Sequence, residues 1–356
     1  MTLALALSWA PWIAGCGVPG FTPQPQPQPR SDASTRSVNS VRFADADVFV
    51  PPGAQERRAA IGPVDHLDPA LQSAFVETAQ FKPVHPPEPG DWLYRVRERG
   101  QTFESYARSD ANQPAKPGEG RDTIYILPIG DFPDGFIVEH ERVVLVRSPA
   151  PEVLEDYAER FFSMPVEVLE PLAQDEIKVR ARVRHGRDQL YAPEILELLA
   201  PRVPADGFCL IALTNDDLFA DEAQEFSFGF ASLTGRVGVY SFARYDPLFN
   251  GEERGAFFLD LILRRSLKIM SHEIGHMFGL EHCVHYGCLM NGAADLIETD
   301  RNPPFLCPVC LRKLQFATGF EPVPRYRAML EFYDEHELRD ELRWLEGRLA
   351  FVTGEY

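Results

Sequence analysis

Residues 271–310 read SHEIGHMFGLEHCVHYGCLMNGAADLIETDRNPPFLCPVC, and this stretch decides the fold. It begins with His272, Glu273 and His276 in the pattern HExxH. On a helix, two histidines four residues apart project from the same face, so both imidazoles can reach one metal ion. Glu273 lies one step round the helix, where its carboxylate can address a water on that metal rather than the metal itself. The pattern therefore predicts a helix that binds a catalytic metal.

The residues after the helix predict a third ligand. Gly279 follows His276 by three positions, and a glycine is free to adopt the left-handed conformation that ends a helix and turns the chain back. That return brings His282 to the metal. Three protein ligands and a water suit a catalytic zinc, because its open fourth position activates water and polarises a carbonyl. The alternative is an ordinary amphipathic helix whose histidines pack or are solvated.

Four of the six cysteines follow closely: Cys283, Cys288, Cys307 and Cys310. Two closely spaced pairs separated by a loop are typical of a closed, tetrahedral structural zinc site. Two disulfides are the alternative, since cysteines of an exported protein can oxidise instead. Because Cys283 directly follows His282, this second metal would brace the third ligand of the first.

Together these residues resemble the signature of the archaemetzincins, which are metzincin-type zinc metalloproteases with a second, four-cysteine zinc site. The resemblance implies two zinc ions, one catalytic and one structural. It also implies that Met290 is the Met-turn residue beneath the catalytic metal. The implied roles are catalytic zinc ligands for His272, His276 and His282, general base for Glu273, and structural zinc ligands for Cys283, Cys288, Cys307 and Cys310.

Strands and helices alternate in the predicted catalytic domain, residues 121–320, which indicates an α+β fold with a mixed, twisted sheet covered by helices. Residues 123–130 form a continuous apolar run, as expected for a strand buried on both faces. In metzincins, an edge strand before the active-site helix binds extended substrate by strand addition, and two predicted strands compete for that position. The further predicted strands are 143–146, 165–169, 208–213, 226–230 and 236–242, and the helices are 69–78, 151–162, 193–199, 256–280 (the long active-site helix) and 311–317.

Two segments flank this domain. Residues 41–120 are rich in Pro and Gly and predict an irregular extension that packs on the domain. Within it, residues 89–106 resemble a segment of eukaryote-type archaemetzincins, and we expect Trp92 and Phe103 to anchor it. Residues 321–356 predict a helical segment, whose charged helix at 325–350 either packs on the domain or binds a partner.

The first residues predict export. Residues 1–15 are apolar but too short to span a bilayer as a mature helix, which is typical of a signal peptide. The run Ile13-Ala14-Gly15-Cys16 resembles a bacterial lipobox, so we expect lipid on Cys16, followed by a Pro-rich spacer at 16–40. This layout predicts lipid anchoring in the bacterial cell envelope. If the start is only a fortuitous Ala/Leu-rich stretch, the protein is cytoplasmic.

The charge balance argues against nucleic acid and against anionic membrane surfaces as partners, because 53 Asp and Glu outnumber 35 Lys and Arg for a net charge of −18. We expect a monomer that acts on peptides or proteins and touches a membrane only through its lipid.

The metal-binding residues predict a zinc metallopeptidase, and the rival interpretation is a catalytically silent zinc module that binds peptides. Glu273 favours the enzyme, because binding alone has no use for a base. In the sequence, His285 and Tyr286 lie between the residues of the two metal sites. His285 is a candidate for an extra metal ligand, and Tyr286 is a candidate for stabilising the tetrahedral oxyanion of peptide hydrolysis.

Overall fold

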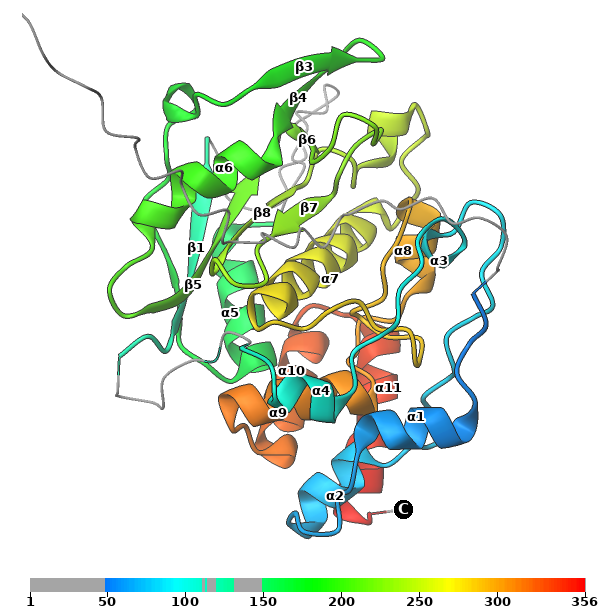
Figure 1. The fold of residues 1–356 in the computed structure, drawn as a ribbon. Coiled ribbons are helices and arrows are strands. Elements are labelled where there is room, and N and C mark those ends of the chain that lie inside the picture. The colour runs from blue at the N-terminus through cyan, green and yellow to red at the C-terminus, as the bar shows by residue number, and fades with distance from the viewer. Residues whose placement is uncertain (1–48, 111–112, 114–119, 131–148, 356) are drawn as a thin grey trace, which may run out of the picture. The chain divides into compact units, whose positions relative to one another are not determined.

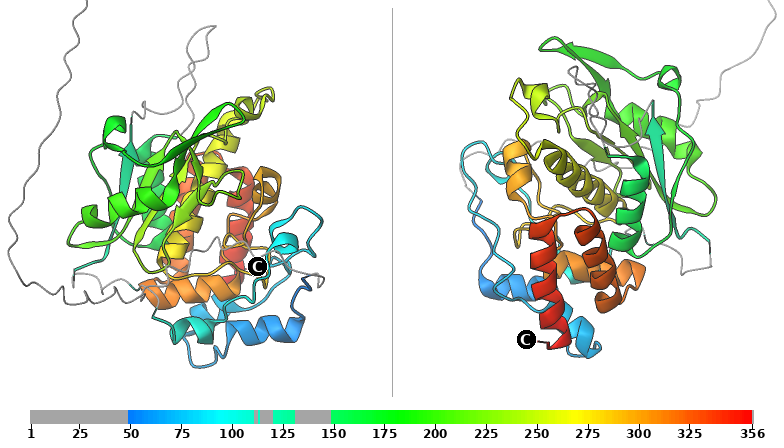
Figure 2. Two further views of the ribbon diagram at one scale, coloured as in Figure 1. Left: turned by 45° about the horizontal axis from the view of Figure 1, so that its top comes forward. Right: turned by 180° about the vertical axis from the view of Figure 1, so that it is seen from behind.

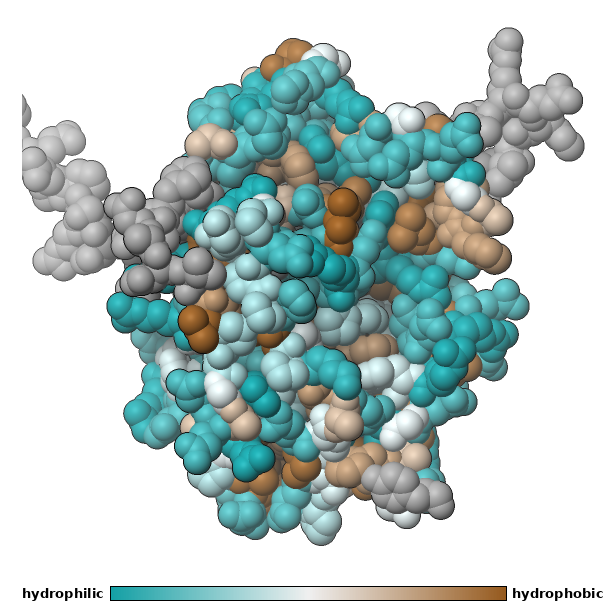
Figure 3. Space-filling model, turned by 90° about the vertical axis from the view of Figure 1, so that its right-hand side faces the viewer, coloured by the Kyte–Doolittle hydropathy of each residue, from teal (hydrophilic) through white to brown (hydrophobic). Residues whose placement is uncertain are grey.

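The computed structural model describes residues 49–110, 113, 120–130 and 149–355. Its contacts divide the chain into Met1–Ser34 and Thr35–Tyr356, and all described residues belong to the second unit. The predicted signal peptide, Cys16, the spacer and the strand at 143–146 lie outside the described residues. Among the described helices, none has the length and apolar character needed to cross a membrane. The face shown in Figure 3 is largely hydrophilic, with apolar side chains in small groups.

The main sheet is mixed, as predicted. Its order is β2-β1-β5-β8-β7, in which the first four strands are parallel and β7 runs antiparallel to β8 at one edge. All residues of β1, β5 and β8 are buried, because their continuous apolar runs are covered on both faces. The bounds are β1 Thr123–Ile129, β2 Val166–Val168, β5 Gly207–Thr214, β7 Gly229–Ala231 and β8 Val237–Ser241.

Helices cover the sheet on both sides (Figure 1). Along β1, Ile124 and Ile126 face the core that holds α5 (Pro151–Phe162) and α7 (Phe258–Met277). The alternate residues Tyr125 and Leu127 face the core under α6 (Ala192–Leu199). Side chains of a strand alternate between its faces, so a strand that is apolar at every position needs this three-layer arrangement. The α+β class is confirmed.

A second, three-stranded sheet of β3 (Ala181–Arg184), β4 (Arg187–Tyr191) and β6 (Asp217–Phe219) was not predicted. The strand β3 has only four residues, and its alternation is inverted: Ala181 and Val183 are exposed, whereas Arg182 and Arg184 are partly buried, so no apolar face marks it as a half-buried strand. The hairpin turn places His185 and Gly186 in the left-handed region, with φ of 51° and 74°. Two such residues in succession are typical of a tight two-residue hairpin.

The segment predicted to be helical at 325–350 is helical, and it forms two helices, α10 (Pro322–Glu335) and α11 (Arg339–Thr353). The chain reverses at Glu337, whose φ is 53°, and the Leu338 N–H donates to the Tyr333 carbonyl at 2.8 Å. Folding back lets both helices bury apolar side chains against each other and against α2 and α5 (Figure 2).

The extension packs on the domain through four short helices, of which α2 confirms the helix predicted at 69–78. Their bounds are α1 Ala54–Ile61, α2 Pro69–Phe75, α3 Trp92–Arg95 and α4 Phe103–Ala107. The remaining elements are α8 Leu296–Arg301, α9 Pro308–Thr318 and three 3-10 turns, Gln174–Glu176, Ala200–Arg202 and Pro247–Asn250.

Candidate metal centres and active-site cleft

The active-site helix α7 ends at Met277, before the predicted end at residue 280, and the chain turns at Gly279 as predicted. His272 and His276 lie in its last turns, and Gly279 follows in the left-handed conformation with φ of 80°. The Gly279 N–H donates to the His276 carbonyl at 2.8 Å, and the Leu280 N–H donates to the Gly275 carbonyl at 3.1 Å. The last carbonyls of a helix have no partner within the helix, and these bonds supply donors to two of them. They also turn the chain back on itself.

The return brings His282 to the two helical histidines. One ring nitrogen from each of His272, His276 and His282 lies within 4.8 Å of the others, and the Nε2 atoms of His272 and His276 are 2.9 Å apart. Zinc–nitrogen bonds of about 2.05 Å in a tetrahedron separate the nitrogens by about 3.3 Å. The cluster thus has the dimensions of a three-histidine metal site.

The hydrogen bonds of the rings identify the atoms that face the cluster. The Nδ1 of His272 lies 2.9 Å from the Leu289 carbonyl oxygen, and the Nδ1 of His276 lies 2.6 Å from the Leu280 carbonyl oxygen. A carbonyl only accepts, so each Nδ1 holds the ring proton and each Nε2 keeps a lone pair. Two lone pairs that face each other at 2.9 Å fit a cation between them, because no proton is left to bridge them.

Burial keeps these rings neutral. It lowers the pKa of His272 to about 3, with a further contribution from His282. Burial, followed by His272 and His282, holds the pKa of His276 well below its usual range. The neutral imidazole is the form that binds a metal, so the site is in its metal-binding state at neutral pH.

Glu273 lies against the edge strand β7. A Cβ atom at Gly229 would stand 2.6 Å from the Glu273 Oε1, so the glycine makes room for the carboxylate. Only 7% of Glu273 is exposed, and burial raises its pKa to about 8. A carboxyl group that titrates near neutral pH is suited to acid–base chemistry.

The cleft beside these residues holds a cavity of about 390 Å³, which His272, Glu273 and His282 line. Of the two strands that competed for the edge position, β7 lies there, next to α7. It is shorter than the predicted 226–230, because Ser227 pairs with Leu218 of β6 instead. Apolar side chains contribute much of the wall: Trp92, Val96, Phe226, Phe228, Ile269 and Leu289.

The extension also reaches the third histidine, through Trp92 and Glu98. Trp92 was expected only as an anchor, but its ring lies edge-on to His282, with centroids 5.3 Å apart, and lines the cavity. Glu98 was missed: its Oε1 accepts from the His282 Nδ1 at 2.7 Å. These partners are 184 positions apart, so no local spacing reveals them. Phe103 is an anchor as expected, edge-on to Phe316 of α9.

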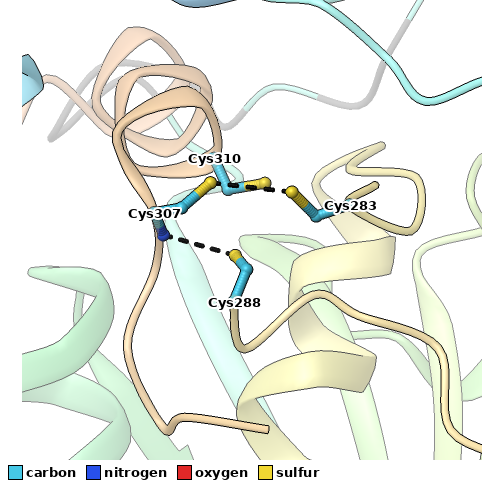
Figure 4. Close-up of side chains that lie close together, drawn as sticks. All are labelled: Cys283, Cys288, Cys307 and Cys310. Carbon is cyan, nitrogen blue, oxygen red and sulfur yellow. Dashed lines mark hydrogen bonds between the residues drawn. The ribbon is translucent and has the colours of Figure 1, made fainter. Parts of the chain in front are cut away.

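The four predicted cysteines lie together and point toward one another (Figure 4). They are buried and form no disulfide, and the Sγ atoms of Cys283 and Cys307 are 3.6 Å apart. Zinc–sulfur bonds of about 2.3 Å in a tetrahedron separate the sulfurs by about 3.8 Å, so the spacing fits a zinc site. Hydrogen bonds from the thiols of Cys288, Cys307 and Cys310 hold the pKa of Cys283 well below its usual range. The sixth cysteine, Cys209, is a buried thiol of β5.

Three more predicted residues lie nearby. Met290 is fully buried, and its sulfur fills the space beside Gly275, where a Cβ would stand 2.6 Å from it. It therefore packs against α7 next to the helical histidines. Tyr286 packs edge-on against Phe81 of the extension, and neither it nor His285 lines the cavity.

The chain is similar to known proteins. The family model Peptidase family M54 matches residues 202–316. Archaemetzincin-2 of Macaca fascicularis is 33% identical over 301 residues, which cover 76% of this chain and 81% of that protein. Archaemetzincin-2 of Mus musculus is 35% identical over 306 residues, which cover 78% of this chain and 82% of that protein. The crystal structure of an archaemetzincin from Archaeoglobus fulgidus, complexed with malonate, is 27% identical, covers 54% of this chain and 99% of that chain, and superposes with a TM-score of 0.40. With about a third of the aligned residues identical to proteins that it matches over most of their length, the chain belongs to the archaemetzincins and is a zinc metallopeptidase.

Proposed function

We propose that peptide bonds are hydrolysed at the centre formed by His272, His276 and His282, with Glu273 as the general base. The observation that supports this most is the convergence of the three imidazoles in a cavity whose wall includes a buried carboxyl group. A zinc ion held there would polarise the scissile carbonyl and lower the pKa of a water molecule.

Glu273 supplies the proton transfers. Its carboxylate accepts a proton from the attacking water and delivers it to the nitrogen of the leaving amine. Both transfers need a group whose pKa lies near the working pH, so that it can take up a proton and release it again. Burial against Gly229 raises the pKa of Glu273 in the metal-free protein, and a cation at the neighbouring histidines would lower it again, which suits a group that takes up and releases a proton.

The cleft supports an extended peptide as substrate. The strand β7 pairs with β8 on one side only, so its outer edge can pair with a peptide strand beside Glu273. Phe226, Phe228 and Trp92 give the cavity apolar walls, which favours a bulky apolar side chain next to the scissile bond.

We also propose a second, structural zinc on Cys283, Cys288, Cys307 and Cys310, supported by the close approach of the four sulfurs. A separate proposal, which rests on the sequence alone, concerns location: Cys16 carries lipid and anchors a monomeric enzyme in the bacterial cell envelope.

The test of the mechanism is Glu273→Gln. The amide keeps the shape of the carboxylate but takes no proton, so we expect kcat/KM for a peptide substrate to fall at least about a hundredfold with zinc content unchanged. Glu281→Gln, an exposed glutamate just after the helix, is the control and should match wild type. Cleavage by Glu273→Gln at the wild-type rate rules out this base. If wild type and variant bind peptides equally and neither cleaves any across a diverse library, the site is a silent peptide-binding module.

A further inference from the structure

The N-terminal extension holds the chain segment that delivers the third histidine. This return segment, residues 278–282, has no regular secondary structure after Gly279. The Tyr106 hydroxyl donates to the Phe278 carbonyl at 2.8 Å, and the Gln101 side-chain amide donates to the Gly279 carbonyl at 3.1 Å. The Gln101 amide oxygen also accepts from the Glu281 N–H at 3.4 Å. The extension therefore pins the segment at three backbone groups.

Glu98 extends this contact to the histidine itself. Its Oε1 accepts from the His282 Nδ1 at 2.7 Å and from the Trp92 indole N–H at 2.9 Å. The His282 and Glu98 side chains are 7% and 16% exposed. With Nδ1–H donated to a carboxylate, the Nε2 lone pair of His282 points away from Glu98 and is free for a metal.

The second carboxylate oxygen of Glu98 has no partner of its own. Glu98 Oε2 is buried and makes no hydrogen bond among the described residues, although the side chain as a whole is 16% exposed. A carboxylate oxygen without a hydrogen bond is stabilised by positive charge close to it. A metal ion on the far nitrogen of His282 would put that charge across one imidazole ring.

Glu98 is itself held in place by the extension's contact with α8. The Trp92 backbone N–H donates to the Glu298 carboxylate at 3.0 Å. The Trp92 ring fills the space beside Gly292, where a Cβ would stand 2.4 Å from the ring. His272 and His276 sit on a helix and their Nδ1 atoms meet backbone carbonyls, of Leu289 and Leu280, so neither depends on a side chain of the extension for its orientation.

We propose that Glu98 is a positioning residue that fixes the tautomer and orientation of His282, so that zinc affinity at the histidine site depends on the N-terminal extension. This inference rests on the proposed function, since it takes His282 to be a zinc ligand.

The experiment measures zinc transfer from the full-length protein to a chelator in wild type and in Glu98→Gln. Removal of such a second partner typically lowers metal affinity 10–100-fold, so we expect a loss of about that size at one of two zinc sites. The second zinc, on the cysteines, should be released as in wild type and reports an intact fold. Glu104→Gln, an exposed glutamate on α4 of the same extension, is the control and should release both zincs as wild type does.

Three outcomes separate this inference from the proposed function. If His282→Ala loses one zinc but Glu98→Gln binds both with wild-type affinity, the positioning role is wrong and the ligand set stands. If His282→Ala keeps both zincs, the ligand set fails and the inference with it. Nitrogen-15 NMR of histidine-labelled wild type needs no variant: a proton on the His282 Nδ1 is expected, and a bare Nδ1 contradicts the proposal.

Discussion

Gly229→Ala tests the geometry of the general base directly. The Cβ of an alanine would stand 2.6 Å from the Glu273 Oε1 and 2.7 Å from its Cδ and Cγ. The Gly229 backbone does not lie in the left-handed region, so alanine adds no backbone strain. The substitution therefore acts on the neighbouring carboxylate through steric contact.

The expected magnitude follows from the overlap. Ordinary van der Waals contact begins at 3.4 Å, so the carboxylate must retreat by about 0.8 Å, the difference between 3.4 and 2.6 Å. A misplacement of about 1 Å at a reacting group can lower a rate about a hundredfold. We expect kcat/KM to fall by about that factor. Both zincs should stay bound, because the atoms nearest the new methyl group all belong to Glu273.

The assay is steady-state peptide hydrolysis combined with metal analysis. Gly255→Ala is the matched control, because its Cβ meets nothing within 4 Å, and it should behave as wild type. The double variant Gly229→Ala/Glu273→Gln should be no slower than Glu273→Gln alone, since both changes remove the same function. Wild-type kcat/KM in Gly229→Ala, or a further loss in the double variant, would refute this reasoning.

Three further predictions concern metal, pH and processing. Cys307→Ser should lose one zinc and lower the unfolding temperature, because structural zinc contributes folding free energy; a wild type with a single zinc contradicts the four-cysteine site. In zinc-free protein, the raised pKa of Glu273 means that the unfolded state ionises first, so stability is lost as pH rises from 4.5 to 8. Glu273→Gln has no carboxyl to ionise, so it should not lose this stability. The difference in unfolding free energy between the variant and wild type, measured in denaturant, should therefore grow in favour of the variant by up to about 5 kcal/mol from pH 4.5 to pH 9. A difference that stays the same over this pH range argues against the raised pKa. Mass spectrometry of protein from its native host should find lipid on Cys16, and an unmodified Met1 would move the protein to the cytoplasm.

The parts of the site that sequence could predict are those that local spacing determines. His272 and His276 share a helical face because they are four residues apart, and Gly279 reverses the chain because it tolerates a positive φ. The buried strands β1 and β5 could be predicted because parallel strands covered on both faces are continuously apolar.

Some parts of the structure could not be predicted, because they depend on contacts between residues far apart in the sequence or on residues with no marked preference for a turn or a strand. Glu98 meets His282 across 184 positions, and nothing in either neighbourhood indicates the contact. The break between α10 and α11 falls at Glu337, which is neither Gly nor Pro, because tertiary packing overrides helix propensity there. The strand β3 was missed because its apolar residues, Ala181 and Val183, are exposed, so it contributes no buried apolar face.

The position of His282 explains why two separate structures surround it. A ligand on irregular chain loses conformational freedom when a metal binds, at about 1–2 kcal/mol for each backbone residue that becomes ordered. Here the extension holds residues 278–282 from one side, and Cys283 ties the next residue to the four-cysteine cluster on the other. On the proposed ligand set, the ordering cost would be met during folding and not at metal binding, which would strengthen zinc binding at the histidine site. By linkage, zinc bound there would stabilise the docked extension by the same amount, so loss of the metal should weaken the docking of the extension.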